Sequence, residues 1–307
     1  MAGSQDFVAD PRNAGLLVYL DGALVPTEDA KVSIFDAGFG LGDGVWEGIR
    51  LHKRALLFLD AHLDRLYAGA AAIRIDIGLT RSELIAEMKR LLEANTMTDG
   101  GHLRLMVTRG RKRSINQDPR QALGKPTIAI TAEFKVKPPE TSRGLALRSV
   151  TTRTSRPDTF DMRLNSHSRL NLIRALIEAL DVDPETDEAI MLDPHGQVAS
   201  CNATNFFWVR DGRVETSTGT YCFNGITRDN VIAACRAGAA PVLECSVPLR
   251  HVLAAEEAFV TGTMGGITPV RSIDGHAMPL VNGPVTQKIA AAYEAMKDAD
   301  AAANPIV

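Results

Sequence analysis

Short apolar runs recur along the first half of the chain at the lengths and spacings that predict strands. Asp21-Gly22 separates the first two runs, and this dipeptide is typical of a tight turn between paired strands. The predicted strands of this half span residues 15–20, 22–25, 45–50, 102–110 and 126–134.

Two stretches between these strands have the spacing of amphipathic helices. The first places Leu63 and Leu66 on one face, with Asp60 as the predicted N-cap. The second, 80–93, begins with Thr80 and has Glu83 three residues later, which is a capping-box pattern. Strands with two intervening helices predict an α+β domain.

A Pro-Pro pair interrupts this pattern and predicts a domain boundary, because proline disfavours both helix and sheet. We therefore expect an N-terminal α/β domain over residues 1–137, a linker over 138–143 and a C-terminal α/β domain over 144–307.

The second half opens with a strand and then a predicted helix over 168–180. Its apolar residues recur at helical spacing: Leu170, Ile173, Leu176, Ile177 and Leu180. The remaining predicted elements are strands at 145–150, 188–193, 205–209, 213–217 and 258–263, and helices at 226–238, 248–257 and 284–298.

The stretch from Cys222 to Val231 reads as a turn at Gly225 followed by a helix start. Ile226 and Thr227 would present unpaired backbone N–H groups there, at the positive end of the helix dipole. Such a helix start suits a phosphate group. A capped surface helix is the commoner meaning of Gly-x-Thr before a helix, so this stretch alone decides nothing.

Composition narrows the classes of function. The chain has 307 residues, 45% of them hydrophobic and 23% charged, as in an ordinary soluble enzyme. A net charge of -3 indicates no nucleic-acid partner, and no apolar run reaches the length of a membrane span.

The start of the chain is polar and lacks signal-peptide character. The four cysteines form no Cys-x-x-Cys pair, which favours reduced thiols in the cytoplasm and no bound metal.

Seven stretches occur in the order GDGVWEGIR, AHLDRL, LNLIRALIEA, DEAIMLDPHGQV, NFF, NGITR and FVTGTMGGITPV. Together they resemble the class IV aminotransferases, which include branched-chain and D-amino-acid aminotransferases and aminodeoxychorismate lyase. The resemblance covers roughly residues 15–300 and implies the two-domain α+β fold of fold type IV pyridoxal phosphate (PLP) enzymes.

The resemblance implies a phosphate cup, by which we mean Arg65, Ile226, Thr227 and Thr263. A guanidinium fork suits a phosphate, although a helix arginine is otherwise usually solvated. The full set of residues implied to contact PLP or pyridoxamine phosphate is Arg65, Ser200, Asn202, Phe223, Ile226, Thr227, Thr263 and Met264. Phe223 would lie against the cofactor ring, with plain core packing as its alternative role.

The family also implies small-molecule partners, an amino donor and a keto-acid acceptor. Trp46 would line the substrate side, and Arg104 or Arg109 would meet a substrate carboxylate, unless each is a solvated strand arginine. The loops 36–43 and 109–116 would border the substrate. In this family the site lies between the domains and near the partner subunit, which implies a homodimer.

The chain departs from the family at its working residue, a lysine that forms a Schiff base with PLP. Three residues before Asn171, where that lysine is expected, stands Ser168, and Arg169 follows it. No lysine occurs anywhere from Pro138 to Gln287. Arginine is no substitute, because its guanidinium stays protonated and is not a usable nucleophile.

A second departure concerns the glutamate that the family places near the pyridine nitrogen of PLP. Ser200 takes that position here. A hydroxyl carries no charge to stabilise a protonated ring nitrogen, so the ring would be a poorer electron sink.

Three interpretations remain open. In the first, the chain is an aminotransferase impaired at Ser168 or Arg169. In the second, it binds PLP, pyridoxamine phosphate or another phosphorylated ligand without a covalent bond. In the third, it performs lysine-independent chemistry with His167, Ser168 and Asn171. A helix-cap role for His167 is the alternative to catalysis.

Overall fold

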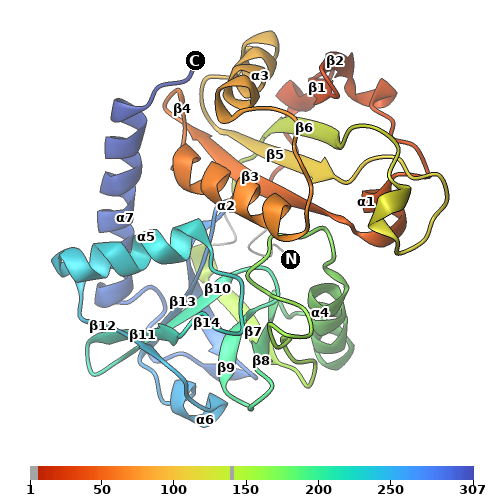
Figure 1. Cartoon of the computed structure of the whole chain (residues 1–307). Coiled ribbons are helices and arrows are strands. Elements are labelled where there is room, and N and C mark those ends of the chain that lie inside the picture. Colours follow the sequence, from red (N-terminus) through yellow and green to blue (C-terminus); the bar gives the residue numbers. More distant parts are fainter. Residues whose placement is uncertain (1–5, 139–141) are drawn as a thin grey trace. The chain divides into compact units, whose positions relative to one another are not determined.

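The computed structural model describes residues 6–138 and 142–307 (Figure 1). Three residues of the predicted linker, 139–141, therefore lie outside the described part. The chain forms two compact units. The N-terminal unit comprises Ala9–Val136, Leu164–Ser168 and Lys297–Val307, and the C-terminal unit comprises Met1–Val8, Lys137–Arg163 and Arg169–Met296. The sequence predicted a single boundary near residue 137. After that point the chain contributes two further segments, 164–168 and 297–307, to the N-terminal unit.

The N-terminal unit contains an antiparallel sheet with strand order β2-β1-β6-β5-β3-β4. The predicted β1–β2 hairpin is confirmed, and its turn residues Asp21 and Gly22 both have positive φ, 48° and 97°. The strands are β1 (Leu17–Leu20), β2 (Ala23–Pro26), β3 (Gly44–His52), β4 (Ala55–Leu56), β5 (Gly101–Thr108) and β6 (Thr127–Phe134).

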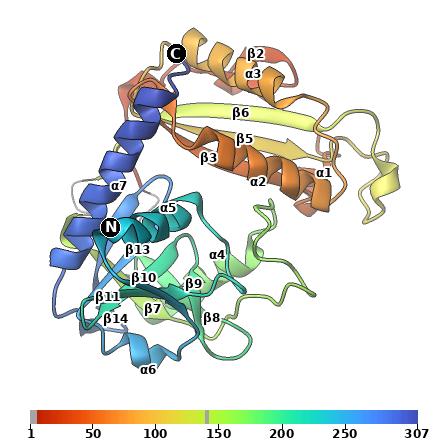
Figure 2. The ribbon, with the colours of Figure 1, turned by 60° about the vertical axis from the view of Figure 1, so that its left-hand side comes forward.

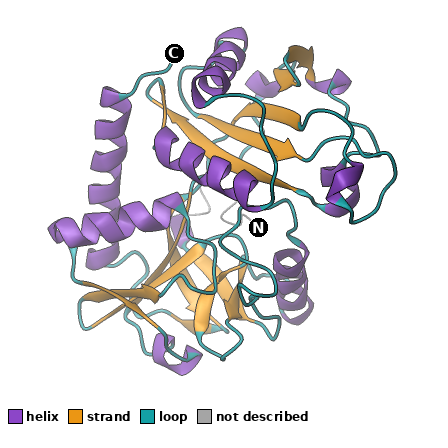
Figure 3. Cartoon of the chain, in the orientation of Figure 1, coloured by secondary structure: helices purple, strands orange, loops and turns teal. Residues whose placement is uncertain are grey.

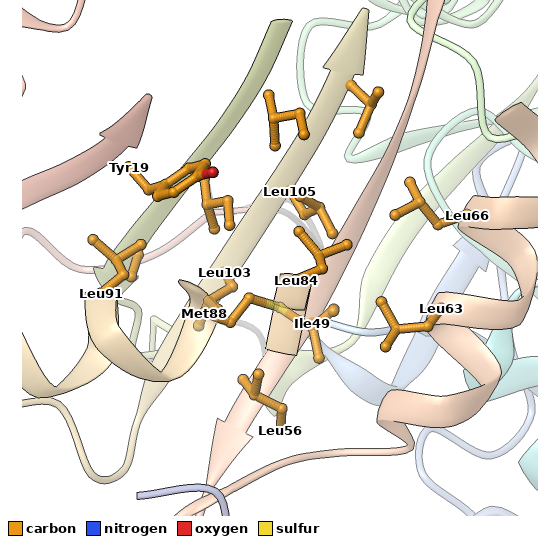
Figure 4. Close-up of a cluster of buried hydrophobic side chains, with 14 of the residues drawn as sticks. Tyr19, Ile49, Leu56, Leu63, Leu66, Leu84, Met88, Leu91, Leu103 and Leu105 are labelled. Carbon is orange, nitrogen blue, oxygen red and sulfur yellow. The ribbon is translucent and has the colours of Figure 1, made fainter. Parts of the chain in front are cut away.

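Helices α2 (Leu59–Ala72) and α3 (Arg81–Ala94) contribute buried side chains to the core of this unit. Figure 4 shows Leu63 and Leu66 from α2, and Leu84 and Met88 from α3, around Ile49 of the sheet. This unit also contains the short helix α1 (Ala37–Leu41) and the 3-10 turns η1 (Pro11–Asn13), η2 (Thr27–Asp29) and η3 (Pro119–Gln121).

The starts of α2 and α3 test the capping predictions. The capping box of Thr80 and Glu83 is confirmed. Asp60 as the N-cap of α2 is wrong, because the cap is Phe58 in a left-handed conformation, whose amide donates to Asp300 at 2.7 Å. Asp60 instead lies in the first turn, where a carboxylate interacts favourably with the helix dipole.

The C-terminal unit contains a mixed sheet with the order β12-β11-β10-β13-β14-β7-β8-β9, and β15 pairs with β14. The sequence did not predict β9, β12 or β14, which are short or interrupted by glycine and proline. The strands are β7 (Leu145–Ser149), β8 (Glu188–Leu192), β9 (Val198–Cys201), β10 (Asn205–Arg210), β11 (Arg213–Ser217), β12 (Val242–Cys245), β13 (Glu257–Gly262), β14 (Gly266–Ile273) and β15 (His276–Ala277).

Apolar residues cover both faces of this sheet, so β10 is buried along nearly its whole length. Phe206 and Trp208 belong to one cluster, whereas Phe207 stacks on Phe259 in another, with ring centroids 5.0 Å apart. The second cluster includes residues of α5 (Ile226–Ala234) and α7 (Pro284–Ala303), and Figure 2 shows α5 beside β13.

Two helices of this unit differ from the sequence predictions. The predicted helix 248–257 is only the short α6 (Leu249–Val252), because Glu257 already begins β13. A turn of π-helix, η5 (Cys235–Ala239), extends α5. Among the described helices, none combines the length and the apolar character that a membrane span requires.

Helix α4 (Leu170–Val182) exposes many of its apolar side chains. Figure 3 distinguishes the helices, strands and loops of the chain by colour. Its fully buried residues are only Ala175 and Ala179, which pack against Val150 and Met191. The large side chains on its exposed side are Leu170, Ile173, Ile177, Leu180 and Val182.

Candidate functional site

The loop before α5 is fastened by one buried side chain, Asn205 of β10. Its Nδ2 donates to the Phe223 carbonyl at 2.6 Å, and its Oδ1 accepts from the Gly225 amide at 3.1 Å. A Cβ on Gly225 would come within 2.6 Å of that Oδ1, so the close approach requires glycine. Because Gly225 has no side chain, α5 begins at Ile226 without a side-chain cap, and a helix start of this kind suits a phosphate group.

Strand β13 brings two further threonines beside this helix start. Thr261 lies opposite Asn205 in the β10–β13 register, and Thr263 follows directly after the strand. Within the described residues, the buried hydroxyl of Thr261 has no hydrogen-bond partner. Thr227 is itself buried in the first turn of α5. Three predicted members of the phosphate cup, Ile226, Thr227 and Thr263, therefore belong to adjacent elements of one unit, and Met264 comes next in the chain.

Arg228 anchors α5 to the sheet, a role that the sequence analysis missed. Its buried guanidinium donates to the Ser217 carbonyl at 2.7 Å and to Glu244 at 2.8 Å. The helix start is thus held by Asn205 on one side and Arg228 on the other. The signal for Arg228 was its place in NGITR, but spacing alone cannot say that an arginine points inward.

Ser200 lies on β9 and is buried, and its hydroxyl is already engaged. It donates to the Thr204 carbonyl at 2.7 Å and accepts from Asn205 Nδ2 at 3.3 Å. The only proton of the Ser200 hydroxyl is thus used in a hydrogen bond within the protein, and the side chain carries no charge. Asn202 also has a structural contact, because its Oδ1 accepts from the Ala189 amide at 2.7 Å.

The segment Leu164–Ser168 contains the position of the expected lysine and runs along β3 of the N-terminal unit. The Trp46 amide donates to Asn165 at 2.9 Å, and the His167 amide donates to Gly44 at 3.0 Å. The Ser168 hydroxyl lies against Gly42, donating to its carbonyl at 3.4 Å, a long and weak hydrogen bond. Ser168 therefore ends a segment whose backbone is hydrogen-bonded to β3.

Arg169 begins α4 in the C-terminal unit. Its guanidinium carbon is 5.5 Å from the centre of the Phe223 ring, a cation–π distance. The side chain of Asn171 makes a 3.4 Å contact with the sulfur of Met162. Phe223 thus contacts a cation within its own unit, a role that differs from the plain core packing considered as its alternative.

Arg65 is held by a buried carboxylate. Its Nε and Nη2 donate to the two oxygens of Glu47, both at 2.7 Å, and His62 Nδ1 lies 2.7 Å from Glu47 Oε2. Burial by itself would raise the pKa of Glu47, but the hydrogen bonds from Arg65 and His62 outweigh it and lower that pKa. Glu47 stays ionised and fixes the Arg65 fork.

Glu47 and His62 are functional candidates that the sequence analysis missed. Both lie inside the quoted stretches, GDGVWEGIR and AHLDRL. The available signal was a charged residue at an inward strand position, between Val45 and Ile49.

The two candidate substrate arginines differ in their contacts. Arg104 lies over the Trp46 ring, with 3.9 Å from its guanidinium carbon to the ring centre. Arg109 instead forms a two-pronged ion pair with Asp43, at 2.6 and 2.9 Å, and donates to the Ile73 carbonyl at 2.8 Å. Arg109 thus ties the strand to the end of α2, which leaves Arg104 as the better candidate for substrate.

The two predicted loops of the N-terminal unit contain internal hydrogen bonds. Residues 36–43 contain α1, capped by Asp36, whose carboxylate accepts from the Gly38 amide at 2.8 Å. In the loop 109–116, Lys112 is almost fully buried and donates to the Asn116 carbonyl at 2.5 Å. This lysine supports its own loop. Throughout the described ranges, no group of three or more metal-ligating side chains comes together.

The sequence of this chain matches the family model for class IV aminotransferases over residues 44–273. Two Arabidopsis thaliana proteins, branched-chain-amino-acid aminotransferase-like proteins 2 and 1, are 37% and 36% identical over 289 residues, 94% of this chain. The chain spans about half the length of these two relatives, 51% and 52%.

Two shorter relatives match along nearly their whole length. A putative branched-chain-amino-acid aminotransferase of Methanocaldococcus jannaschii is 36% identical over 89% of this chain and 93% of its own. A D-alanine aminotransferase of Bacillus licheniformis is 30% identical over 90% and 95%.

Solved structures agree with this assignment. The branched-chain aminotransferase of Thermoproteus uzoniensis, crystallised with norvaline, has a TM-score of 0.84 at 30% identity, covering 95% of this chain and 99% of that one. A branched-chain amino acid aminotransferase from T.th., solved with pyridoxamine 5'-phosphate, has a TM-score of 0.84 at 26% identity, covering 92% and 95%. The predicted α+β fold of type IV is confirmed, and the chain belongs to the class IV aminotransferase family.

Proposed function

We propose that this chain is a class IV aminotransferase homologue of branched-chain or D-amino-acid type that holds PLP or pyridoxamine phosphate without a covalent bond and is impaired in amino transfer. One contrast carries the proposal. The start of α5 has no side-chain cap and suits a phosphate group, whereas Ser200 is uncharged and its hydroxyl already donates a hydrogen bond to the Thr204 carbonyl.

The residues fit one end of the cofactor. PLP is the cofactor of the class IV aminotransferases and, when bound, supplies the electron-withdrawing ring that amino transfer uses. The amides of Ile226 and Thr227 and the hydroxyls of Thr227 and Thr263 are donors for its phosphate. The unpartnered hydroxyl of Thr261 adds a polar group beside them. Arg65 remains a prediction from the family, with Glu47 holding its fork in place.

The residues do not fit the reactive end. Position 168 has a serine, and Arg169 cannot act as an amine nucleophile at any ordinary pH. Ser200 can neither protonate the ring nitrogen nor balance its charge. Binding through the phosphate thus survives the loss of the groups that the chemistry needs.

The names of the relatives suggest the substrate class. They are branched-chain or D-alanine aminotransferases, so we propose a small amino acid and a 2-oxo acid as partners of any residual activity. Arg104, placed over Trp46, is the residue we assign to the substrate carboxylate.

Calorimetric titration of the purified chain with pyridoxamine phosphate tests the binding. We expect saturable binding that weakens about tenfold in Thr227→Val, which removes one donor, and is unchanged in Thr154→Val, which removes an equally buried hydroxyl elsewhere in the unit. Borohydride treatment of the PLP complex followed by mass spectrometry should show no cofactor bonded to the chain. Absence of binding at millimolar ligand, or a borohydride-fixed adduct, contradicts the proposal.

Restoring the missing groups tests the assignment of their positions. Ser168→Lys combined with Ser200→Glu should give a borohydride-fixed mass increase of one cofactor and measurable amino transfer with L- or D-amino acids. Arg169→Lys combined with Ser200→Glu is the matched control, with the lysine shifted by one residue. If the control gains the adduct and the first variant does not, Arg169 occupies the lysine position.

A further inference from the structure

Residues 297–307, which we call the strap, belong to the N-terminal unit and contact one short stretch of it, residues 52–58. Asp298 of the strap lies 2.8 Å from both His52 Nε2 and Lys53 Nζ. These three side chains are partly exposed, so their ion pairs alone hold the strap only weakly. The backbone contacts of the same stretch are more informative.

The stretch that the strap contacts has an uncommon backbone conformation. Lys53, Arg54 and Phe58 have positive φ angles of 45°, 72° and 54°. Residues with a side chain rarely adopt this left-handed conformation, and they keep it only where surrounding contacts hold them. The Ile306 amide donates to the Arg54 carbonyl at 2.8 Å. Asp300 Oδ2 accepts from the Phe58 amide at 2.7 Å. The strap thus contacts all three left-handed residues.

Asp300 supplies the start of α2 with an acceptor that the neighbouring sequence does not provide. Phe58 is the N-cap residue of α2 and has no polar side chain. At the start of α3, the Thr80 amide donates instead to the nearby Glu83 at 2.7 Å, as in a capping box. Asp300 plays the part of Glu83 from a distant segment, and its negative charge also suits the positive end of the α2 dipole.

A continuous series of contacts leads from Asp300 to Arg65, and we call it the relay. The Phe58 carbonyl accepts from the His62 amide at 3.2 Å, within the first turn of α2. The His62 ring lies 2.7 Å from Glu47 Oε2, and Arg65 donates to both oxygens of Glu47 at 2.7 Å. Every residue of the relay belongs to the N-terminal unit. Displacement of the first turn of α2 therefore moves a ring that helps to hold the Arg65 fork.

We propose that Asp300 is a positioning residue for ligand binding, which acts on Arg65 through Phe58, His62 and Glu47. An arginine whose fork is already fixed loses less conformational entropy when it binds an anion, so the relay raises affinity without touching the ligand. The ligand part of this inference rests on the proposed function, because it takes Arg65 as a donor to the phosphate. The part that concerns α2 does not depend on a ligand.

Calorimetric titration with pyridoxamine phosphate tests the ligand part. We expect the dissociation constant to rise about fivefold in Asp300→Ala, because the first turn of α2 loses its acceptor. Asp300→Asn should retain most of the affinity, since an amide oxygen still accepts from the Phe58 amide. Asp298→Ala is the matched control: it removes a carboxylate from the same strap, but one that contacts His52 and Lys53 and not α2. Its affinity should equal that of wild type.

A double-mutant cycle separates positioning from a general loss of stability. In a His62→Ala background the relay is already interrupted, so adding Asp300→Ala should change the dissociation constant by less than twofold. A general structural role for Asp300 would instead multiply the dissociation constant by the same factor in both backgrounds. That result would overturn the proposal.

Hydrogen–deuterium exchange of the unliganded chain tests the part that concerns α2. Asp300 is partly exposed, so Asp300→Ala should keep the fold. Peptides covering residues 58–66 should exchange faster in this variant than in Asp298→Ala, whereas peptides from α3 should exchange alike. Equal exchange over 58–66 in the two variants contradicts the relay. A wild-type chain that does not bind pyridoxamine phosphate would overturn the ligand part together with the proposed function, while the exchange comparison still decides whether Asp300 fixes α2.

Discussion

Helices α4 and α5 have similar sequence signals and opposite surroundings. Both begin without a side-chain cap, at Arg169 and Gly225 respectively, and both contain aliphatic residues at helical spacing. Helix α5 buries Val231 and Ile232 against the sheet, whereas α4 buries alanines and exposes Ile177. The difference shows that periodicity establishes a helix but not which face of it is covered. In this chain, the covered helix presents the candidate ligand site, whereas the uncovered one leaves large apolar side chains exposed.

The largest expected effect compares one isoleucine from each helix. Ile232→Ala removes a side chain that is 4% exposed and should lower the free energy of unfolding by about 2–5 kcal/mol. Ile177→Ala removes one that is 54% exposed and should change it by less than about 0.5 kcal/mol in the monomer. Urea denaturation of both variants measures the difference, and equal losses would remove the contrast between the helices.

The arginines of the two helices provide the next comparison. Arg228→Met removes the arginine that donates to the Ser217 carbonyl and leaves Glu244 with Arg236 as its remaining arginine partner, and it should cost about 2–4 kcal/mol of stability. Arg174→Met on α4 should be nearly neutral, because Arg174 is exposed and has no hydrogen-bond or ion-pair partner among the described residues. Thermal melting in the presence and absence of pyridoxamine phosphate checks both variants, and a destabilising Arg174→Met would show that α4 is anchored through this side chain.

A smaller effect is expected at the start of α5. Gly225→Ala brings a Cβ within 2.6 Å of Asn205 Oδ1, so the loop must shift at a cost of about 1–2 kcal/mol, and phosphate-ligand affinity should fall with it. Gly262→Ala is the control, since its Cβ would meet the nearest atom at 3.4 Å, an ordinary contact. Calorimetry that gave both variants wild-type affinity would exclude the Asn205 contact as the feature that shapes this helix start.

The smallest effect concerns pH and the anchor of α4. Hydrogen bonds from Thr151 and Thr152 outweigh the opposing effect of burial and lower the pKa of Glu178 from 4.5 to about 2. A depressed folded-state pKa contributes stability that is present above pH 4.5 and is lost as the pH falls toward 2. Glu178→Gln should therefore lower Tm at pH 7, and its difference from wild type should shrink between pH 4.5 and 2. A constant difference over that range would mean that the charge contributes nothing.

Several elements could be predicted because their signals are local. The Asp21-Gly22 turn and the Thr80–Glu83 capping box depend on neighbours within a few residues, and both are confirmed. The start of α2 was misplaced because its cap depends on Asp300, far away in the sequence. Strand β14 was missed because glycine and proline obscure its pattern, while pairing with β13 and β7 stabilises it.

The features of the candidate site also divide into those that the sequence predicts and those that depend on the tertiary structure. The order of its motifs identified the family, and the missing lysine at Ser168 could be read directly from the sequence. Glu47 as the support of Arg65, and Asn205 as the support of Gly225, could not be predicted, because each pair is joined by side-chain contacts across separate elements.

The sequence by itself determined the family, the main helices and strands, and the residue types at positions 168 and 200. Only the tertiary structure decided that the Ser200 hydroxyl donates a hydrogen bond to the Thr204 carbonyl and that Arg109 forms an ion pair with Asp43. It also decided that the apolar side of α4 is exposed. The physical reason is the separation of the interacting residues along the sequence. Turns, caps and helical periodicity arise from residues close in the chain, whereas burial and hydrogen-bond partners depend on which distant segments pack together.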